Sequence, residues 1–189
     1  MEGFKIIISL AFLLVCCFSS ISAYSDTSAL QTFENNEFGF SFTIPPGWKK
    51  LDNNLVPGVK ALVRSSAKGA SSNCNIRAVL NEKFKSISSK EYISMVYPNN
   101  DPSDFMSEYK TSGFNPEFIR SQHMSIDGSD AVYVEVYITN QGHIFQTFNA
   151  QFLKNGGLYT IGCTDIPKSF SSSKKEFSIL LDSFKIHSR

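Results

Sequence analysis

The chain has 189 residues, and its 18 lysines and arginines nearly balance its 17 aspartates and glutamates, giving a net charge of +1. This balance argues against a nucleic-acid-binding protein, which concentrates positive charge on one surface. The length suits a single domain that buries its own core, and no repeat or low-complexity segment indicates a second one.

The first 23 residues have the pattern of a secretory signal peptide. A lysine near the start precedes an apolar run over residues 6–18, and mostly small or polar residues follow. We predict cleavage after Ala23, and therefore a secreted or periplasmic protein without a membrane span. Acylation of Cys16 or Cys17 is an alternative that would make it an envelope-anchored lipoprotein. A spanning helix needs about 20 apolar residues, which disfavours an uncleaved anchor.

Residues 24–36 are polar and aperiodic, so we predict a flexible leader followed by one folded domain over residues 37–189. Apolar residues then take every second position from Phe38 to Ile44, which is the period of a half-buried strand. Two prolines end this strand because proline cannot donate to a sheet ladder. Gly47 permits a turn that brings Trp48 back over the core.

The middle of the chain predicts two strands and two short helices. The strands cover residues 59–65 and 74–80, and a loop rich in serine, glycine and alanine joins them. Ser88 and Glu91 form a capping box that begins the first helix. Asp101 and Pro102 begin the second.

The remainder predicts an antiparallel meander and a final helix. The strands of the meander cover residues 118–126, 131–139, 143–153 and 158–164. Glycine-containing turns join them, of which Asp-Gly and Asn-Gly are the strongest hairpin signals. Ser173 and Glu176 form a capping box for the last helix. Because hairpins connect most strands, we predict an α+β fold with a mostly antiparallel sheet of about seven strands and helices packed on it.

Two cysteines follow the predicted signal peptide, Cys74 and Cys163, and each lies in a predicted strand. An even number of cysteines in an oxidising compartment favours a disulfide, while two separate buried thiols are the alternative. No C-x-x-C pair follows the signal, so neither a redox motif nor a zinc knuckle is indicated.

Three sequence motifs together resemble the PsbP-like superfamily, which includes DcrB-like and LpqN-type proteins. They are the alternating aromatic strand that ends in IPPGW at Trp48, the segment GGLYTI over residues 156–161, and the segment ILLDSF that ends at Phe184. The resemblance covers residues 36–187 and implies an α-β-α sandwich that serves as a binding or assembly module. The matching positions are structural and carry no functional role: Phe42, Pro46, Gly47, Trp48, Ser183 and Phe184.

The residue pattern does not predict an enzyme. A catalytic triad would have to recruit His123, His143 or His187, and any serine and aspartate near one of them would be expected by chance. The segment around Ser41 lacks the second glycine of a nucleophile elbow. No cofactor is predicted.

A metal-dependent protein or hydrolase is the alternative from another functional class. His123, Asp127 and Asp130 lie close in sequence, and hairpin pairing would bring their side chains together. However, Asp127 followed by glycine is explained by turn chemistry alone. These residues are therefore weak candidates for metal ligands.

Two neighbouring strands of the meander suggest a possible binding surface. Tyr133 and Tyr137 share a face of the first strand, and Phe145, Asn149 and Gln151 share a face of the second. If the two registers agree, aromatic rings and amides form one recognition surface. The alternative is that helices cover this face. The sequence thus predicts a non-catalytic binding or assembly module for a protein or small-molecule partner that it does not identify.

Overall fold

The computed structural model describes residues 30–52, 58–98 and 101–188. The predicted signal peptide and the candidate acylation sites Cys16 and Cys17 lie outside these ranges. No helix within the described ranges is long and apolar enough to cross a membrane.

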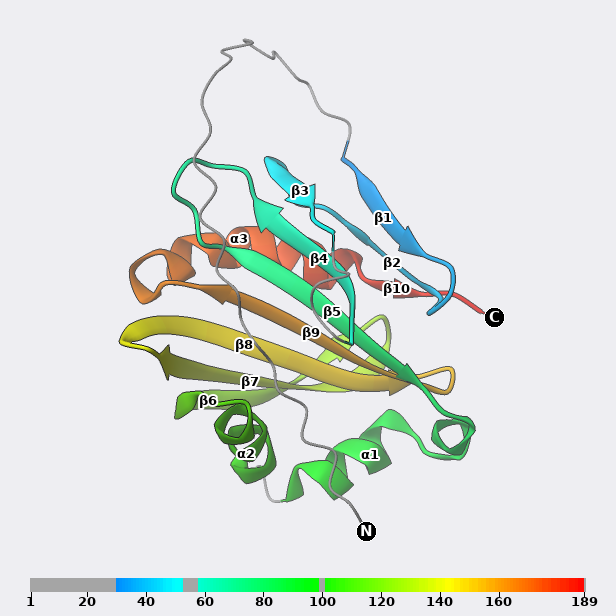
Figure 1. Ribbon diagram of the computed structural model, residues 1–189. Coiled ribbons are helices and arrows are strands. Elements are labelled where there is room, and N and C mark those ends of the chain that lie inside the picture. The colour runs from blue at the N-terminus through cyan, green and yellow to red at the C-terminus, as the bar shows by residue number, and fades with distance from the viewer. Residues whose placement is uncertain (1–29, 53–57, 99–100, 189) are drawn as a thin grey trace, which may run out of the picture.

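A seven-stranded antiparallel sheet forms the centre of the fold (Figure 1), with strand order β3-β4-β5-β9-β8-β7-β6. This arrangement confirms the predicted α+β class and the predicted meander, because β6 to β9 are consecutive neighbours. In sheet order the strands are β3 (Trp48–Lys50), β4 (Val59–Ser65), β5 (Asn73–Leu80), β9 (Gly157–Asp165), β8 (His143–Lys154), β7 (Ser129–Asn140) and β6 (Asn115–Ile126).

A second, three-stranded sheet joins the two ends of the domain. Its order is β1 (Thr32–Asn35), β2 (Phe40–Thr43) and β10 (Lys185–Ile186). Strand β1 lies inside the segment predicted to be a flexible leader, so that prediction is wrong for these residues. Phe33 of β1 is buried and its ring stacks on Phe42 at 5.0 Å between centroids. Strand β1 has four residues, of which only Phe33 is apolar. Such a short segment shows no alternation from which a strand could be predicted.

Helices lie on both faces of the large sheet (Figure 1). The 3-10 helix η1 (Glu82–Ser86) leads into α1 (Ser89–Val96), and α2 (Ser103–Thr111) follows. The capping box predicted for α1 is present, since the Ser88 side chain accepts from Glu91 N and the Glu91 carboxylate accepts from Ser88 N at 2.8 Å. Helices α1 and α2 pack on the β6–β8 side of one face, and α3 (Pro167–Ser183) packs on the opposite face.

Helix α3 begins earlier than the sequence indicated. Its first residue is Pro167 and its N-cap is Ile166, so Ser173 lies inside the helix and the capping box predicted there does not form. Proline is favoured in the first turn, where its missing N–H needs no partner. The Ser173 hydroxyl instead donates to Asp165 Oδ2 at 2.6 Å.

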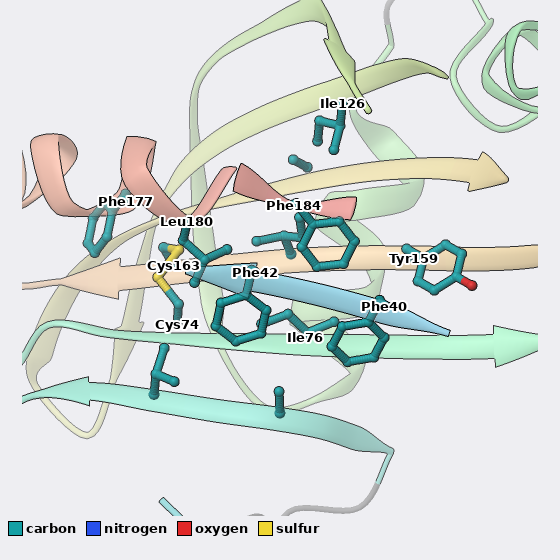
Figure 2. Close-up of a cluster of buried hydrophobic side chains, with 14 of the residues drawn as sticks. Phe40, Phe42, Cys74, Ile76, Ile126, Tyr159, Cys163, Phe177, Leu180 and Phe184 are labelled. Atoms are coloured by element: carbon teal, nitrogen blue, oxygen red, sulfur yellow. A yellow bond between two sulfur atoms is a disulfide. The ribbon is translucent and has the colours of Figure 1, made fainter. Parts of the chain in front are cut away.

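The main core lies between the large sheet, α3 and the small sheet, and aromatic rings dominate it (Figure 2). Phe184 stacks on Phe40 at 5.5 Å and on Phe42 at 6.2 Å. Trp48 contacts Phe177 edge-on at 6.0 Å, as expected for a residue that folds back over the core. A smaller core, containing the valines of β7, lies under α1 and α2.

The positions that matched the PsbP-like motifs have structural roles. Phe42, Trp48 and Phe184 are buried in the main core, and Gly47 has a φ of +74° that disfavours other residues. The Ser183 hydroxyl accepts from Thr43 N at 2.9 Å and donates to Ile179 O at 2.6 Å, which ties the end of α3 to β2.

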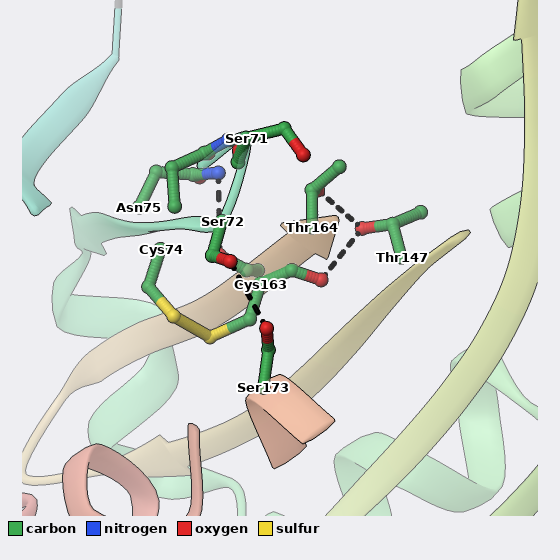
Figure 3. Close-up of a disulfide and its surroundings, with 10 residues drawn as sticks. Ser71, Ser72, Cys74, Asn75, Thr147, Cys163, Thr164 and Ser173 are labelled. Carbon is green, nitrogen blue, oxygen red and sulfur yellow. Dashed lines mark hydrogen bonds between the residues drawn. A yellow bond between two sulfur atoms is a disulfide. The ribbon is translucent and has the colours of Figure 1, made fainter. Parts of the chain in front are cut away.

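The predicted disulfide is present between β5 and β9 (Figure 3). Cys74 and Cys163 are direct cross-strand partners, and both are fully buried. They are separated by 89 residues in the sequence, so the bond closes a long loop. It also lies between two central strands of the sheet.

Candidate functional site

The recognition surface predicted from β7 and β8 does not form, because the strand register divides its members between two faces. Ile138 pairs with Phe145, and Val134 pairs with Asn149. Direct cross-strand partners share a face, so Phe145, Asn149 and Gln151 lie with the valines of β7 and not with its tyrosines. Tyr133 faces the other way and stacks on Phe148 at 4.8 Å.

The amides Asn149 and Gln151 nevertheless belong to a polar surface, on the face of the sheet opposite α3. Figure 1 shows α1 and α2 beside β6–β8, with no described helix over the β3–β4–β5–β9 part of this face. We call this surface the open face. Its members are Lys49, Arg64, Asn73, Asn75, Arg77, Thr147, Asn149, Gln151, Thr160, Gly162 and Thr164.

The open face is ordered in cross-strand rows. The first row runs through Lys49, Arg64, Asn73, Thr164 and Thr147, which pair one to the next across five strands. In this row Thr164 Oγ1 donates to Thr147 Oγ1 at 2.8 Å, and Thr147 Oγ1 donates to Cys163 O at 3.1 Å. The hydroxyls are therefore held in place by hydrogen bonds within the sheet.

The second row places a glycine between two asparagines. Asn75, Gly162 and Asn149 are direct partners on β5, β9 and β8. A Cβ atom at Gly162 would lie 2.7 Å from Asn149 Oδ1 and 3.2 Å from Asn75 Nδ2. Since real Cβ atoms do not approach so closely, the glycine is what allows the two amides to lie across the middle of the sheet.

Two tyrosines from the helices border the open face. The Tyr92 hydroxyl of α1 donates to Gln151 Oε1 at 3.3 Å, and Gln151 Nε2 donates to Thr160 Oγ1 at 3.2 Å. The Tyr109 hydroxyl of α2 accepts a hydrogen bond from Asn149 Nδ2. Burial, with a smaller contribution from the Glu108 charge, raises the pKa of Tyr92 to about 12. Burial also raises the pKa of Tyr109, so both phenols stay neutral near pH 7.

These groups suit recognition and not proton transfer. Amides and hydroxyls both donate and accept hydrogen bonds, and neither ionises near neutral pH. Alternation along β8 predicts that the two amides share a face, but the aromatic residues expected beside them on β7 lie on the other face. The two-residue turn Gln141–Gly142 is the sequence signal that predicts the β7–β8 register. A two-residue hairpin loop fixes the register and brings Asn140 opposite His143.

The weak metal candidates are not gathered into a site. His123 and Asp130 pair with Val132 and Ser125 in the β6–β7 ladder. Asp127 lies in the turn, where its carboxylate accepts from Lys154 Nζ at 2.6 Å, Lys185 Nζ at 3.1 Å and Ile186 N at 3.0 Å. Within the described ranges, no group of three histidine, cysteine, aspartate or glutamate side chains is placed to hold a metal ion.

Asp127 therefore connects the β6–β7 turn to β8 and to the C-terminal strand. Burial opposes its ionisation, but the hydrogen bonds from Lys154, Ile186 N and Lys185 outweigh burial and lower its pKa to about 2. A lowered carboxyl pKa stabilises the folded state at pH values above the unfolded pKa, and the stabilisation disappears as the pH falls through the folded pKa.

We expect Asp127→Asn to lower the free energy of unfolding by about 2 kcal/mol at pH 7. Urea unfolding at several pH values measures the effect. The difference in free energy of unfolding between wild type and Asp127→Asn should decrease as the pH falls from about 4 to 2. Asp130→Asn, which changes an exposed aspartate in the next strand, should cost less than about 0.5 kcal/mol. A gap that is the same at pH 7 and pH 2 would show that the carboxylate charge is not the cause.

A serine–histidine contact lies within the described residues, between Ser41 Oγ and His187 Nε2 at 2.8 Å. Ser41 lies inside β2, which is paired with β1 on one side and β10 on the other. Its neighbouring backbone amides face these ladders, so they are not directed at a developing oxyanion in the way that acyl transfer requires. The contact extends the pairing of β2 with the C-terminal segment.

A groove of about 900 Å³ lies where η1 and the start of α1 meet the β8–β9 turn. Its lining includes Leu80, Phe84 and Leu153, and three charged residues, Glu82, Lys85 and Lys154. Lys85 is paired with Glu82 at 2.8 Å, and Lys154 is paired with Asp127. Because the charged groups here already have partners, the open face is the stronger candidate site.

The chain is similar to known proteins both in its family and in its fold. A family model described as PsbP matches residues 28–186. A search of curated protein sequences finds no match.

Several solved structures share the fold at low sequence identity. The cyanobacterial PsbP (CyanoP) of Synechocystis sp. has a TM-score of 0.60 and 15% identity over 89% of this chain and 98% of its own. LpqN of Mycobacterium tuberculosis, described as involved in cell envelope biogenesis, has a TM-score of 0.50 and 11% identity, covering 86% and 87%. The Ran-binding protein Mog1p of Saccharomyces cerevisiae has a TM-score of 0.52 and 9% identity, covering 84% and 95%.

Proposed function

The chain belongs to the PsbP family, and from this premise we propose that it is a non-catalytic binding or assembly module that recognises its partner through the open face. The observation that carries the proposal is the ordered row of Asn75, Gly162 and Asn149, which runs from the part of the sheet without a described helix over it to β8 beside α1 and α2. Rows of oriented amides and hydroxyls are the groups that recognition surfaces use to fix a partner's orientation.

The named neighbours are compatible with this role, although they share only the fold. Mog1p is described as Ran-binding, and LpqN as involved in cell envelope biogenesis. A fold shared at such low identity suggests a class of function and does not transfer a partner or a site. The open face is therefore proposed from the residues of this chain alone.

We propose further that the module acts outside the cytoplasm, as a secreted or periplasmic protein. The apolar run at residues 6–18 and the buried disulfide support this location, because structural disulfides persist in oxidising compartments. Intact-mass analysis of the native protein tests it. A chain that begins at Tyr24 supports secretion, whereas one that begins at Cys16 or Cys17 with acyl chains supports an anchored lipoprotein.

Site-specific cross-linking tests the open face directly. A photoreactive benzophenone residue at Asn75 or Arg77 should capture a defined partner from the native compartment, whereas the same residue at Ser171 or Ser178 on the exposed side of α3 should not. Adding Gly162→Val to the variant with the probe at Arg77 should reduce the cross-linked product by about tenfold or more, because the new side chain displaces Asn75 and Asn149.

Valine is favoured in strands, so we expect Gly162→Val to keep the fold. An unchanged circular dichroism spectrum of this variant would show that the loss of cross-linking reflects lost recognition and not unfolding. Equal capture of the partner from the α3 positions and from the open face would contradict the proposal that the open face is the binding site. Turnover in a broad hydrolase screen that His187→Ala abolishes would contradict the non-catalytic role.

A further inference from the structure

The members of the open face include three cations and no carboxylate, and the charge of Glu108 on α2 acts on Tyr92 and Tyr109 at its border. Lys49 and Arg64 are direct cross-strand partners on β3 and β4, and Arg77 lies farther along the same face on β5. Strands β3, β4, β5 and β8 contain no aspartate or glutamate. The only acidic residue of β9, Asp165, is buried and accepts hydrogen bonds from Ser72 and Ser173.

The pairing of Lys49 with Arg64 is unfavourable in the isolated protein. Like charges directly opposite each other destabilise a sheet, and both side chains are exposed. Neither takes part in an ion pair with a carboxylate of the described residues. Arg64 Nη2 donates to Ala70 O at 3.0 Å, which restrains the guanidinium. Such a pair gains most from an anion that binds both cations.

We infer that the open face binds an acidic peptide segment of a partner protein, with Lys49 and Arg64 holding its carboxylates and Asn73 and Asn75 bonding to its backbone. This inference rests on the proposed function and adds the chemistry of the partner. Arginine and lysine bind carboxylates through charge-assisted hydrogen bonds, and an amide side chain donates and accepts as a peptide group requires.

The dimensions of the first row fit an extended chain. Neighbouring strands lie about 4.8 Å apart, so the row from Lys49 to Thr164 spans about 14 Å, the length of about four residues of extended peptide. A nucleic acid would call for a larger excess of positive charge than this chain has, with its net charge of +1. The observations thus favour a short acidic segment of a protein.

The test uses a fluorescent twelve-residue peptide of alternating glutamate and threonine, with binding followed by anisotropy at low salt. Lys49→Glu should weaken binding by about tenfold or more, and raising the salt should weaken wild-type binding because it screens exposed charges. Lys168→Glu on α3 is the matched control, since it makes the same change at an exposed lysine elsewhere, and it should leave binding within about twofold.

Thermal stability distinguishes lost binding from lost folding. Lys49→Glu replaces a like-charge pair with an opposite-charge pair, so we expect its melting temperature to equal or exceed that of wild type. A variant that is at least as stable and yet does not bind supports a role for the Lys49–Arg64 pair in recognition. Arg64→Gln should weaken binding as well, without introducing a new negative charge.

Two results would overturn the inference. Equal weakening of peptide binding by Lys49→Glu and Lys168→Glu would indicate non-specific attraction of polyanions. Absence of peptide binding while Asn75 still cross-links to a partner would overturn the acidic-peptide inference alone and leave the proposed function standing. Absence of both would overturn the proposed function as well.

Discussion

Replacing both bridged cysteines, Cys74→Ala with Cys163→Ala, should lower the free energy of unfolding by about 4 kcal/mol. The bond joins residues that are 89 positions apart, and closing a loop of that length removes much of the conformational entropy of the unfolded chain. Both positions are fully buried, so alanine fits the space. Urea unfolding followed by the fluorescence of Trp48, the single tryptophan, measures the loss.

Wild-type protein unfolded with a thiol reductant should show nearly the same stability as the double-alanine variant. This comparison separates the bond itself from the small change in packing. A variant that is within about 1 kcal/mol of wild type would mean that the two strands hold the core without the covalent link, and that the disulfide has little effect on folding.

The second large effect is expected at Asp165, whose carboxylate is buried beside the disulfide. It accepts hydrogen bonds from Ser71 Oγ, from Ser72 and Ser173 Oγ at 2.6 Å each, and from Ile166 N at 2.7 Å. Figure 3 shows Ser72 and Ser173 next to the disulfide. These bonds join the β4–β5 loop, the end of β9 and α3.

Asp165→Ala should lower the free energy of unfolding by about 3 kcal/mol at pH 7, because several buried donors lose their acceptor at once. Asp182→Asn, at an exposed position of α3, should cost less than about 0.5 kcal/mol. The measurement is urea unfolding of the three proteins under identical conditions. A cost below about 1 kcal/mol would mean that water satisfies the serines as well as the carboxylate does.

The pH dependence gives a second measurement at Asp165. Burial opposes ionisation, but the hydrogen bonds from Ser173, Ser71, Ser72 and Ile166 N outweigh it and lower the pKa of the carboxyl. Its contribution is therefore present above the unfolded pKa of about 3.9 and is lost as the pH falls through the lower folded value. The gap between wild type and Asp165→Ala should narrow only below about pH 4.

The candidate site shows which part of a binding surface a sequence can predict. The amide pair Asn149 and Gln151 was identified because both lie on one face of a single strand, which alternation reveals. Their tyrosine partners could not be predicted in this way, because Tyr92 and Tyr109 come from helices more than 30 residues earlier in the chain. The role of Gly162 could not be predicted either. The space that it leaves for Asn75 and Asn149 depends on two strands that flank it only in the folded sheet.

The elements of the fold were mostly predictable because their signals are local. Alternating apolar residues and the turns at Asp127–Gly128 and Asn155–Gly156, where all four residues have positive φ, defined the strands of the meander within a few positions. The capping box at Ser88 and Glu91 placed the start of α1. Each of these signals depends on side chains that act on backbone nearby in the sequence.

The sequence by itself therefore determined the class of fold and most of its strands, and it favoured a disulfide between Cys74 and Cys163 over two separate thiols. Only the tertiary structure decided that β1 joins the core and that α3 begins at Pro167. These outcomes depend on contacts between segments far apart in the chain, where burial of Phe33 or a hydrogen bond to Asp165 outweighs the local preference. The open face arises in the same way, because a surface exists only where packed helices leave part of a sheet uncovered.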